Sequence, residues 1–172
     1  MSASSLLTST PKTEVFTSYL PIAYGSFSST QTQVVNPAFP ALAPLPLVYT
    51  TTDITPLGVS CATPSASIVV ATTGVYKVFS SVQCDKTSVG VGDLEMWIAV
   101  NGIAVPNSAS RLAMNQNLES LMSVEWIVNL TAGNAVSIVL ASAVDGLQAI
   151  AVPAAPPVPA IPSVITTILR IA

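Results

Sequence analysis

The sequence holds few side chains of the kinds that catalyse reactions. It has no histidine, the residue most often used for proton transfer, so a Ser-His-Asp or Cys-His arrangement in its usual form is excluded. Lys77 or Lys86 could activate a serine, but no strand-turn-helix motif of the nucleophile-elbow type marks such a serine. We therefore predict that the protein is not an enzyme.

Acidic side chains are the remaining candidates for acid-base chemistry or metal binding. The carboxylates considered are Asp85, Asp93, Glu95, Glu119, Glu125 and Asp145. Asp93 and Glu95 lie two residues apart, so on a β-strand both point to one face, which we expect to be a solvated strand edge. No spaced oxygen-rich loop of the calcium-binding type accompanies them. Gly90-Val91-Gly92 lacks the third glycine and the helix of a phosphate-binding loop. We expect no metal ion and no cofactor.

Cys61 and Cys84 can form at most one disulfide. We favour two free thiols that pack as small apolar side chains, and a disulfide between them is the alternative. Neither cysteine has a second ligand at metal-binding spacing, so we expect no zinc site.

Composition limits the partners. Of the 172 residues 51% are hydrophobic and only 8% are charged, against about 25% charged in an average globular protein. Five Lys and Arg against eight Asp and Glu give no electrostatic drive toward phosphate backbones, so nucleic acid is not expected as a partner. So few charges cannot cover a free-standing surface, which typically needs about 25–35% charged residues. We predict a homo-oligomer or a subunit of a larger assembly.

The chain divides into an arm and a domain. Residues 1–21 are polar and rich in Ser and Thr, without the basic and apolar regions of a secretion signal, and we expect an arm that lies on a neighbouring subunit. Residues 22–172 show short alternating segments separated by Pro and Gly, which predicts an all-β domain. No run of about 20 apolar residues occurs, so no membrane span is expected.

Apolar-polar alternation locates the strands. They are expected at residues 24–35, 48–54, 67–71, 74–84, 94–100, 103–105, 122–130, 135–143, 147–152 and 163–171. Asn101-Gly102 predicts a type I′ hairpin turn, and the dense prolines between Pro37 and Pro46 predict a loop or an extended edge piece. About eight to ten strands without a helical period predict an antiparallel β-sandwich. Spacing alone leaves a jelly roll and an immunoglobulin-like sandwich open, although both tryptophans follow both cysteines, unlike the immunoglobulin order.

Two aromatic residues and one charged pair are further candidates. Trp97 and Trp126 each lie inside an alternating strand, where tryptophan more often anchors a core or an interface than binds a ligand. Glu125 points to the opposite side of its strand from Trp126. If that side is an intersubunit surface, Arg111 is its expected partner.

An ordered set of motifs resembles one family. In residues 97–111, WIAVNGIAVPNSASR, a Trp strand, an Asn-Gly hairpin, Val-Pro-Asn-Ser and an Arg follow one another. A Gly-Val-Tyr strand precedes them at Gly74, and a Trp strand with a Leu-x-Ala-Gly turn at residues 130–133 follows. Over roughly residues 22–172 the set resembles the single jelly-roll structural proteins, similar to complement and tumour-necrosis-factor heads, of large icosahedral DNA viruses and tailed phages. The motif residues, expected in the core or an interface, are Trp97, Asn101, Gly102, Val105, Pro106, Asn107, Ser108, Arg111 and Trp126.

The resemblance implies a ten-stranded jelly roll that forms a trimer and contacts other capsid proteins. It would be a minor capsid or vertex component located in the virion. The alternative is the receptor- or glycan-binding head of a viral surface fibre, with specificity in the loops at residues 85–92 and 107–119. No collagen-like stalk precedes the domain, which favours the structural role. The loop at residues 152–162 is longer and richer in proline than the family pattern.

Overall fold

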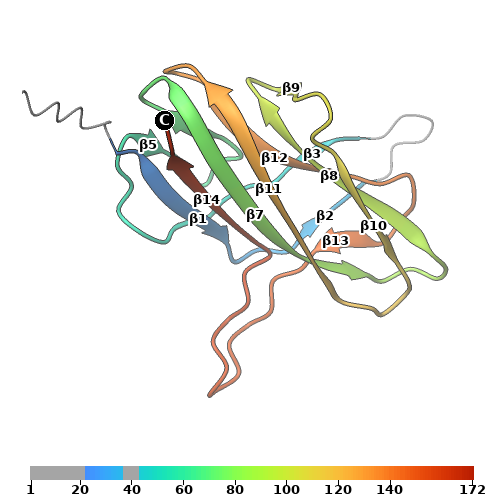
Figure 1. Cartoon of the computed structure of the whole chain (residues 1–172). Helices are drawn as coiled ribbons and strands as arrows, with labels where there is room; N and C mark the ends of the chain where they lie inside the picture. The colour runs from blue at the N-terminus through green and yellow to red at the C-terminus, as the bar shows by residue number, and fades with distance from the viewer. Residues whose placement is uncertain (1–21, 37–42) are drawn as a thin grey trace, which may run out of the picture.

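Two antiparallel sheets pack face to face in the computed structural model, which describes residues 22–36 and 43–172 (Figure 1). The described residues form no helix, so the predicted all-β antiparallel sandwich is confirmed. The predicted arm at residues 1–21 lies outside the described residues, as do Pro37 and Pro40 of the proline-dense segment.

The first sheet is organised around β7, which pairs with β11 along one edge and with β14 along the other. Its strands in spatial order are β11 (Ser120–Leu130), β7 (Gly74–Lys86), β14 (Val164–Arg170), β1 (Tyr24–Ser29) and β4 (Thr51–Thr52), and β13 (Leu147–Ala149) and β2 (Gln33–Val34) continue it from the end of β7. The strict alternation of β7 explains this central position. Tyr76, Val78 and Ser80 point into the core while Phe79 is exposed, so the predicted alternation of this strand separates a buried face from an outer one.

The second sheet is organised around β8 and β12. Its strands in spatial order are β10 (Ser110–Met114), β8 (Gly92–Val100), β12 (Ala135–Ala141), β6 (Ile68–Val70) and β5 (Val59–Ser60), with β9 (Ile103–Ala104) paired to β8 and β3 (Leu45–Pro46) paired to β12. Asn101 and Gly102 both have positive φ, 52° and 77°, as the predicted type I′ turn requires. The Asn101 side-chain Oδ1 accepts a hydrogen bond from the Ala135 N–H at 2.8 Å, which ties this turn to β12.

Some boundaries differ from the expected ones. The described residues form fourteen strands, more than the expected eight to ten, because seven of them have only two or three residues. The segment predicted as a strand at residues 48–54 contains only β4. Conversely, β10 lies inside residues 107–119, which were predicted as a loop. Its sequence, SRLAM, has no β-branched residue, so its strand signal is weak, and pairing with β8 is what holds it extended.

The core lies between the inner faces of the sheets and includes one buried polar group of side chains. The Tyr49 hydroxyl donates to Thr166 Oγ1 at 2.9 Å, and Ser80 Oγ lies 2.9 Å from the same oxygen. All three residues are completely buried, and burial raises the pKa of Tyr49 above its usual range. Because buried hydroxyls without partners are costly, this group fixes how β7 and β14 sit against the segment that carries Tyr49.

A hairpin rich in proline projects from the sandwich between β13 and β14 (Figure 1). Backbone hydrogen bonds join Val152 with Ile161 and Ala155 with Val158, at distances of 2.8 to 3.0 Å. Every residue from 153 to 161 is exposed. The long loop anticipated here is therefore a paired structure, which we call the proline hairpin (residues 151–162).

Candidate functional site

Trp126 occupies a closed site at the edge of the core. Its side chain is 8% exposed, and its Nε1–H donates to the Ser108 carbonyl at 2.8 Å. The Ser108 hydroxyl in turn donates to the Val105 carbonyl at 2.7 Å. Between them Asn107 has a φ of 60°. Val105, Pro106, Asn107 and Ser108 therefore form a turn held by Trp126, and this half of the family motif is structural.

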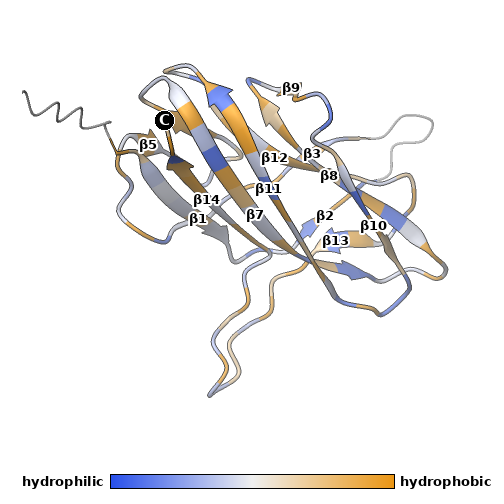
Figure 2. Cartoon of the chain, viewed as in Figure 1, coloured by the Kyte–Doolittle hydropathy of each residue, from blue (hydrophilic) through white to orange (hydrophobic). Residues whose placement is uncertain are grey.

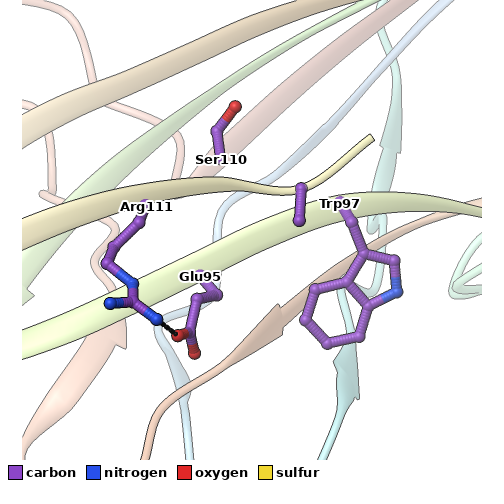
Figure 3. Close-up of a pocket in the computed structure, with 5 residues that line it drawn as sticks. Glu95, Trp97, Ser110 and Arg111 are labelled. Carbon is purple, nitrogen blue, oxygen red and sulfur yellow. Dashed lines mark hydrogen bonds and ion pairs between the residues drawn. The ribbon is translucent and has the colours of Figure 1, made fainter. Parts of the chain in front are cut away.

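Trp97 has a different position, on the outer face of the second sheet, where it is half-buried. It borders two hollows, which we together call the Trp97 hollow (Figure 3). The larger, about 430 Å³, is lined by Glu95, Trp97, Ala109, Ser110 and Arg111. The smaller, about 210 Å³, is lined by Pro44, Pro46, Trp97, Ala99, Gly102, Ala104, Ser137 and Val139. The two tryptophans of residues 97–126 therefore differ in position, because Trp126 packs in the core and Trp97 lies on the outer face of the second sheet.

Arg111 lies at the rim of the Trp97 hollow in an ion-pair network. Its Nη2 donates to Glu95 Oε1 at 2.8 Å, and Nη1 lies 3.5 Å from Asp93 Oδ2. Arg111 stands directly opposite Glu95 in the register of β10 and β8, so the pairing follows from strand neighbours. The expected solvated edge at Asp93 and Glu95 is instead this cross-strand network, in which the Glu95 side chain is only 21% exposed.

The pair of Arg111 with Glu125, expected across an intersubunit surface, stays a prediction, and within one chain each of the two has another partner. Glu125 Oε2 lies 2.6 Å from Lys77 Nζ, an ion pair between β11 and β7 of the first sheet. Arg111 belongs to β10 of the second sheet. The two residues therefore lie on different sheets, a separation that spacing along the chain does not reveal.

The outer face of the first sheet carries exposed apolar side chains on three adjacent strands, interleaved with polar ones. Figure 2 shows hydrophobic and hydrophilic residues alternating along β7 and β11. We call this surface the apolar face, and its exposed apolar residues are Phe79, Leu121, Ile127, Ile165 and Leu169. Leu121 and Ile127 are 63% and 64% exposed. The charged side chains of Lys77 and Glu125 on this face neutralise one another.

Lys86 makes hydrogen bonds that identify it as structural. Its Nζ, on a residue only 1% exposed, donates to Ser88 Oγ at 2.6 Å, to the Ser88 carbonyl at 2.9 Å and to the Asp145 carbonyl at 3.4 Å. The Ser88 hydroxyl donates its own proton to the Asp145 carbonyl at 2.6 Å. The amine thus donates to three acceptors, two of them backbone carbonyls. This pair links the loop after β7 to the loop before β13.

The two cysteines are free thiols. Cys84 is buried on β7, where its Sγ lies 3.4 Å from the Val82 carbonyl, and burial raises its pKa to about 12. Cys61 is partly buried, and burial also raises its pKa. These raised pKa values leave little nucleophilic thiolate near neutral pH. Both cysteines are therefore free thiols that pack as small apolar side chains.

Sequence reasoning missed two features of the Trp97 hollow. Trp97 lies two residues after Glu95 and four after Asp93 on one strand. Alternation of side chains along that strand would have placed all three on one outer face. That Pro44 and Pro46 line the hollow could not be predicted from local alternation, because their position depends on the pairing of β3 with β12.

Within residues 22–36 and 43–172, no three His, Cys, Asp or Glu side chains gather as metal ligands. The same part of the chain has no helix long and apolar enough to cross a lipid bilayer. No protein-family model matches the chain, and a search of curated proteins gives no match.

Proposed function

We propose that this protein is a non-enzymatic structural subunit of a viral capsid that associates with copies of itself, a trimer being the expected form, and with other capsid proteins. The observation that carries the proposal is the apolar face. Ile127, Leu121 and Leu169 are 64%, 63% and 44% exposed there, on strands where soluble monomers usually place charges. These apolar side chains alternate with polar ones across the strands, and so many of them exposed on one face favour a contact with another macromolecule.

The two charges on this face lie in one ion pair. Its ion pair, Lys77 with Glu125, is already formed within one copy, so covering the face leaves no isolated charge without a partner. Each apolar side chain removed from water contributes about 25 cal/mol per Å². Association through this face therefore gains the hydrophobic term, from which the cost of desolvating the Lys77–Glu125 pair is subtracted.

The strand order supports the jelly-roll part of the proposal. The strands β1, β6, β7, β8, β10, β11, β12 and β14 are numbered one to eight along the chain. The first sheet then has the order 6-3-8-1 and the second the order 5-4-7-2. An eight-stranded double-sheet arrangement of two Greek keys has this type of order. The assignment to a virion capsid, as a minor or vertex component, rests on the resemblance of residues 97–111 to the single jelly-roll family.

A second candidate function is the receptor- or glycan-binding head of a surface fibre. The expected loops at residues 85–92 and 107–119 contain no aromatic residue. The Trp97 hollow does combine an aromatic side chain with the carboxylate of Glu95 and the guanidinium of Arg111. A glycan array would test this function, and binding lost in Trp97→Ala would favour it over the structural role.

Sedimentation equilibrium of the full chain tests the self-association. We expect a concentration-dependent oligomer that Ile127→Asp weakens by roughly tenfold or more, because a charged side chain replaces an apolar one that association removes from water. Ile103→Asp is the matched control, since Ile103 is 74% exposed on β9, away from the apolar face. A wild-type chain that stays monomeric at every concentration, or equal effects of both variants, would overturn the proposal.

A further inference from the structure

We propose that the β11 strands of two copies pair edge to edge and antiparallel, so that the two first sheets form one continuous sheet. This contact rests on the self-association proposed above and adds a backbone contact to the one made by the apolar face. An antiparallel pair of identical strands has two-fold symmetry, because the same surface of each copy meets the other. It therefore joins one trimer to the next, whereas the contacts within a trimer follow a three-fold axis.

β11 is an edge strand along its whole length. It pairs with β7 over eleven residues, and no other strand of the described residues pairs with it (Figure 1). The other outermost strands in the described part of the chain are β10, with five residues, and β2, β3, β4, β5 and β9, with two residues each. Short edge strands offer few backbone groups to another chain. Of these edges, β11 therefore has the largest capacity for pairing.

Half of the backbone groups of β11 point away from β7. The Val75 N–H of β7 donates to the Ala172 carbonyl at 2.8 Å, on the β14 side. The Gln83 N–H donates to the Ser163 carbonyl at 3.0 Å, on the same side. Successive residues of an antiparallel strand bond to opposite sides, so the even-numbered residues of β7 bond to β11, where the register pairs them with even-numbered residues.

The odd-numbered residues of β11 therefore direct their N–H and C=O groups to the free edge. Among the described residues, no backbone or side-chain group bonds to these edge groups. The five residues are Leu121, Ser123, Glu125, Ile127 and Asn129. They form a row of alternating donors and acceptors that another strand satisfies by pairing.

β11 lacks the features that usually prevent an edge strand from pairing with another chain. Such features are proline, bulges, lysine and charges that point inward. β11 contains no proline, glycine or lysine, and its register with β7 continues without a bulge from Ser120 to Leu130. Its one charged residue, Glu125, points to the outer face and is paired with Lys77. The edge is therefore open to a second strand.

One register makes β11 complementary to itself. In this register Val124 lies opposite Val124 of the second copy, on the two-fold axis. Leu121, which is 63% exposed, then lies opposite Ile127, which is 64% exposed, and this apolar cross-strand pair occurs twice. Ser123 lies opposite Glu125, so the carboxylate meets a small polar side chain. The neighbouring registers place Glu125 opposite Glu125, Leu121 or Ile127 of the second copy, which is unfavourable for a charged side chain.

Cysteine cross-linking of the full-length protein tests this register. Val124→Cys places two thiols on the two-fold axis in a non-hydrogen-bonded pair, where Cα atoms lie about 4.5 Å apart, within reach of a disulfide. Val128→Cys is the matched control, because Val128 is half-buried on the same face of β11 but lies about 26 Å from Val128 of the second copy in this register. We expect diamide to convert most of Val124→Cys into a covalent dimer on a denaturing gel, and at most a tenth as much of Val128→Cys.

A proline at the free edge tests the backbone contact. The Ser123 N–H points away from β7, so Ser123→Pro removes a donor of the edge while the pairing of β7 with β11 is kept. The change also leaves every residue of the apolar face in place. In sedimentation equilibrium we expect Ser123→Pro to weaken association by tenfold or more and Ser123→Ala, which keeps the N–H, by less than twofold. A circular-dichroism spectrum like that of the wild type shows that the sandwich has formed.

Two results would overturn the proposal. The first is a Val124→Cys chain that forms no more covalent dimer than Val128→Cys, and this result decides the matter even where Ser123→Pro does not fold. The second is a folded Ser123→Pro chain that associates as strongly as Ser123→Ala. Dissociation by Ile127→Asp without a Val124→Cys dimer would leave the apolar face as the contact and remove this one. A Val124→Cys dimer with no effect of Ile127→Asp would keep the β11 contact and overturn the role of the apolar face.

Discussion

The sites of the two tryptophans differ although the sequence surrounds both with similar alternating strands. Trp126 is 8% exposed, and its indole N–H is bonded to the Ser108 carbonyl. Trp97 is half-buried beside an open hollow, and its N–H has no partner among the described residues. The first site is complete within one chain. The second has an apolar ring and a donor that remain available to another molecule.

The difference lies in strand parity and in what covers each face. Trp126 points inward between the sheets, where its body is packed and its polar tip satisfied. Trp97 points outward from β8, where Pro44 and Pro46, at and next to β3, line one of the hollows beside it. The inner faces of this sandwich therefore determine stability, whereas the outer faces are available for contacts. The predictions below test that division.

The two tryptophans should show the largest contrast in stability. Trp126→Ala is expected to lower the free energy of unfolding by about 3–5 kcal/mol, because it leaves a cavity in the core and an unpaired Ser108 carbonyl. Trp97→Ala should cost about 1 kcal/mol, since only part of its side chain is buried. Urea denaturation of the two variants measures both values. Equal losses of unfolding free energy in the two variants would show that Trp97 stabilises the fold as much as Trp126 does, which would contradict the prediction.

Thr166 and Thr167 repeat the comparison on neighbouring residues of β14. Thr166→Val removes the partner of the buried Tyr49 and Ser80 hydroxyls and should cost about 1–3 kcal/mol. Thr167→Val alters an exposed outer position and should change stability by no more than about 0.5 kcal/mol. Thermal unfolding of the two variants provides the check, and a loss for Thr167→Val as large as for Thr166→Val would contradict it.

The cysteines give a contrast that depends on pH. The pKa of Cys84 rises from 9.0 to about 12 in the folded chain, so the unfolded chain loses this proton first as the pH rises. Stability due to the protonated thiol is complete below pH 9 and is lost toward pH 12. When the pH is raised from about 7 to about 10, the free energy of unfolding should fall by about 1 kcal/mol less in Cys84→Ala than in the wild type. Chemical denaturation at both pH values measures this, with Cys61→Ala as the less buried control. No difference between Cys84→Ala and wild type would contradict the prediction.

The outer ion pairs should give the smallest effects. Lys77→Met and Arg111→Met each remove a partly exposed pair, and each should change the free energy of unfolding by less than about 1 kcal/mol. The effect should shrink further at high salt, where exposed charges are screened. Thermal unfolding at two salt concentrations tests this. A salt-independent loss of several kcal/mol would place these side chains in the core.

Local patterns predicted the parts of the fold that depend on neighbouring residues. The alternation of β7 and the turn at Asn101 and Gly102 follow from side-chain period and backbone conformation alone, and both occur as predicted. β10 was missed because SRLAM extends through pairing with β8, a partner outside its own sequence. Pairing in the proline hairpin was hidden because prolines cannot donate, and the hydrogen bonds come from Val152, Ala155, Val158 and Ile161.

The candidate site was predictable only in part. The motif identified Trp97 and Arg111, and both line one hollow. The intrachain partners of Arg111, Asp93 and Glu95, were not predicted, because they depend on the pairing of β10 with β8. Contacts of this type depend on the packing of the whole domain, and single-sequence patterns do not encode them directly.

The position of β14 has a consequence for how the chain becomes native during synthesis. β14 lies between β1 and β7 and pairs with both, so the early part of the first sheet has an open slot until residues 164–170 leave the ribosome. In the nascent domain β1 and β7 therefore have no strand between them until β14 is synthesised, and this part of the first sheet forms in one late step. Chaperones that shield unpaired strand edges would act in this interval.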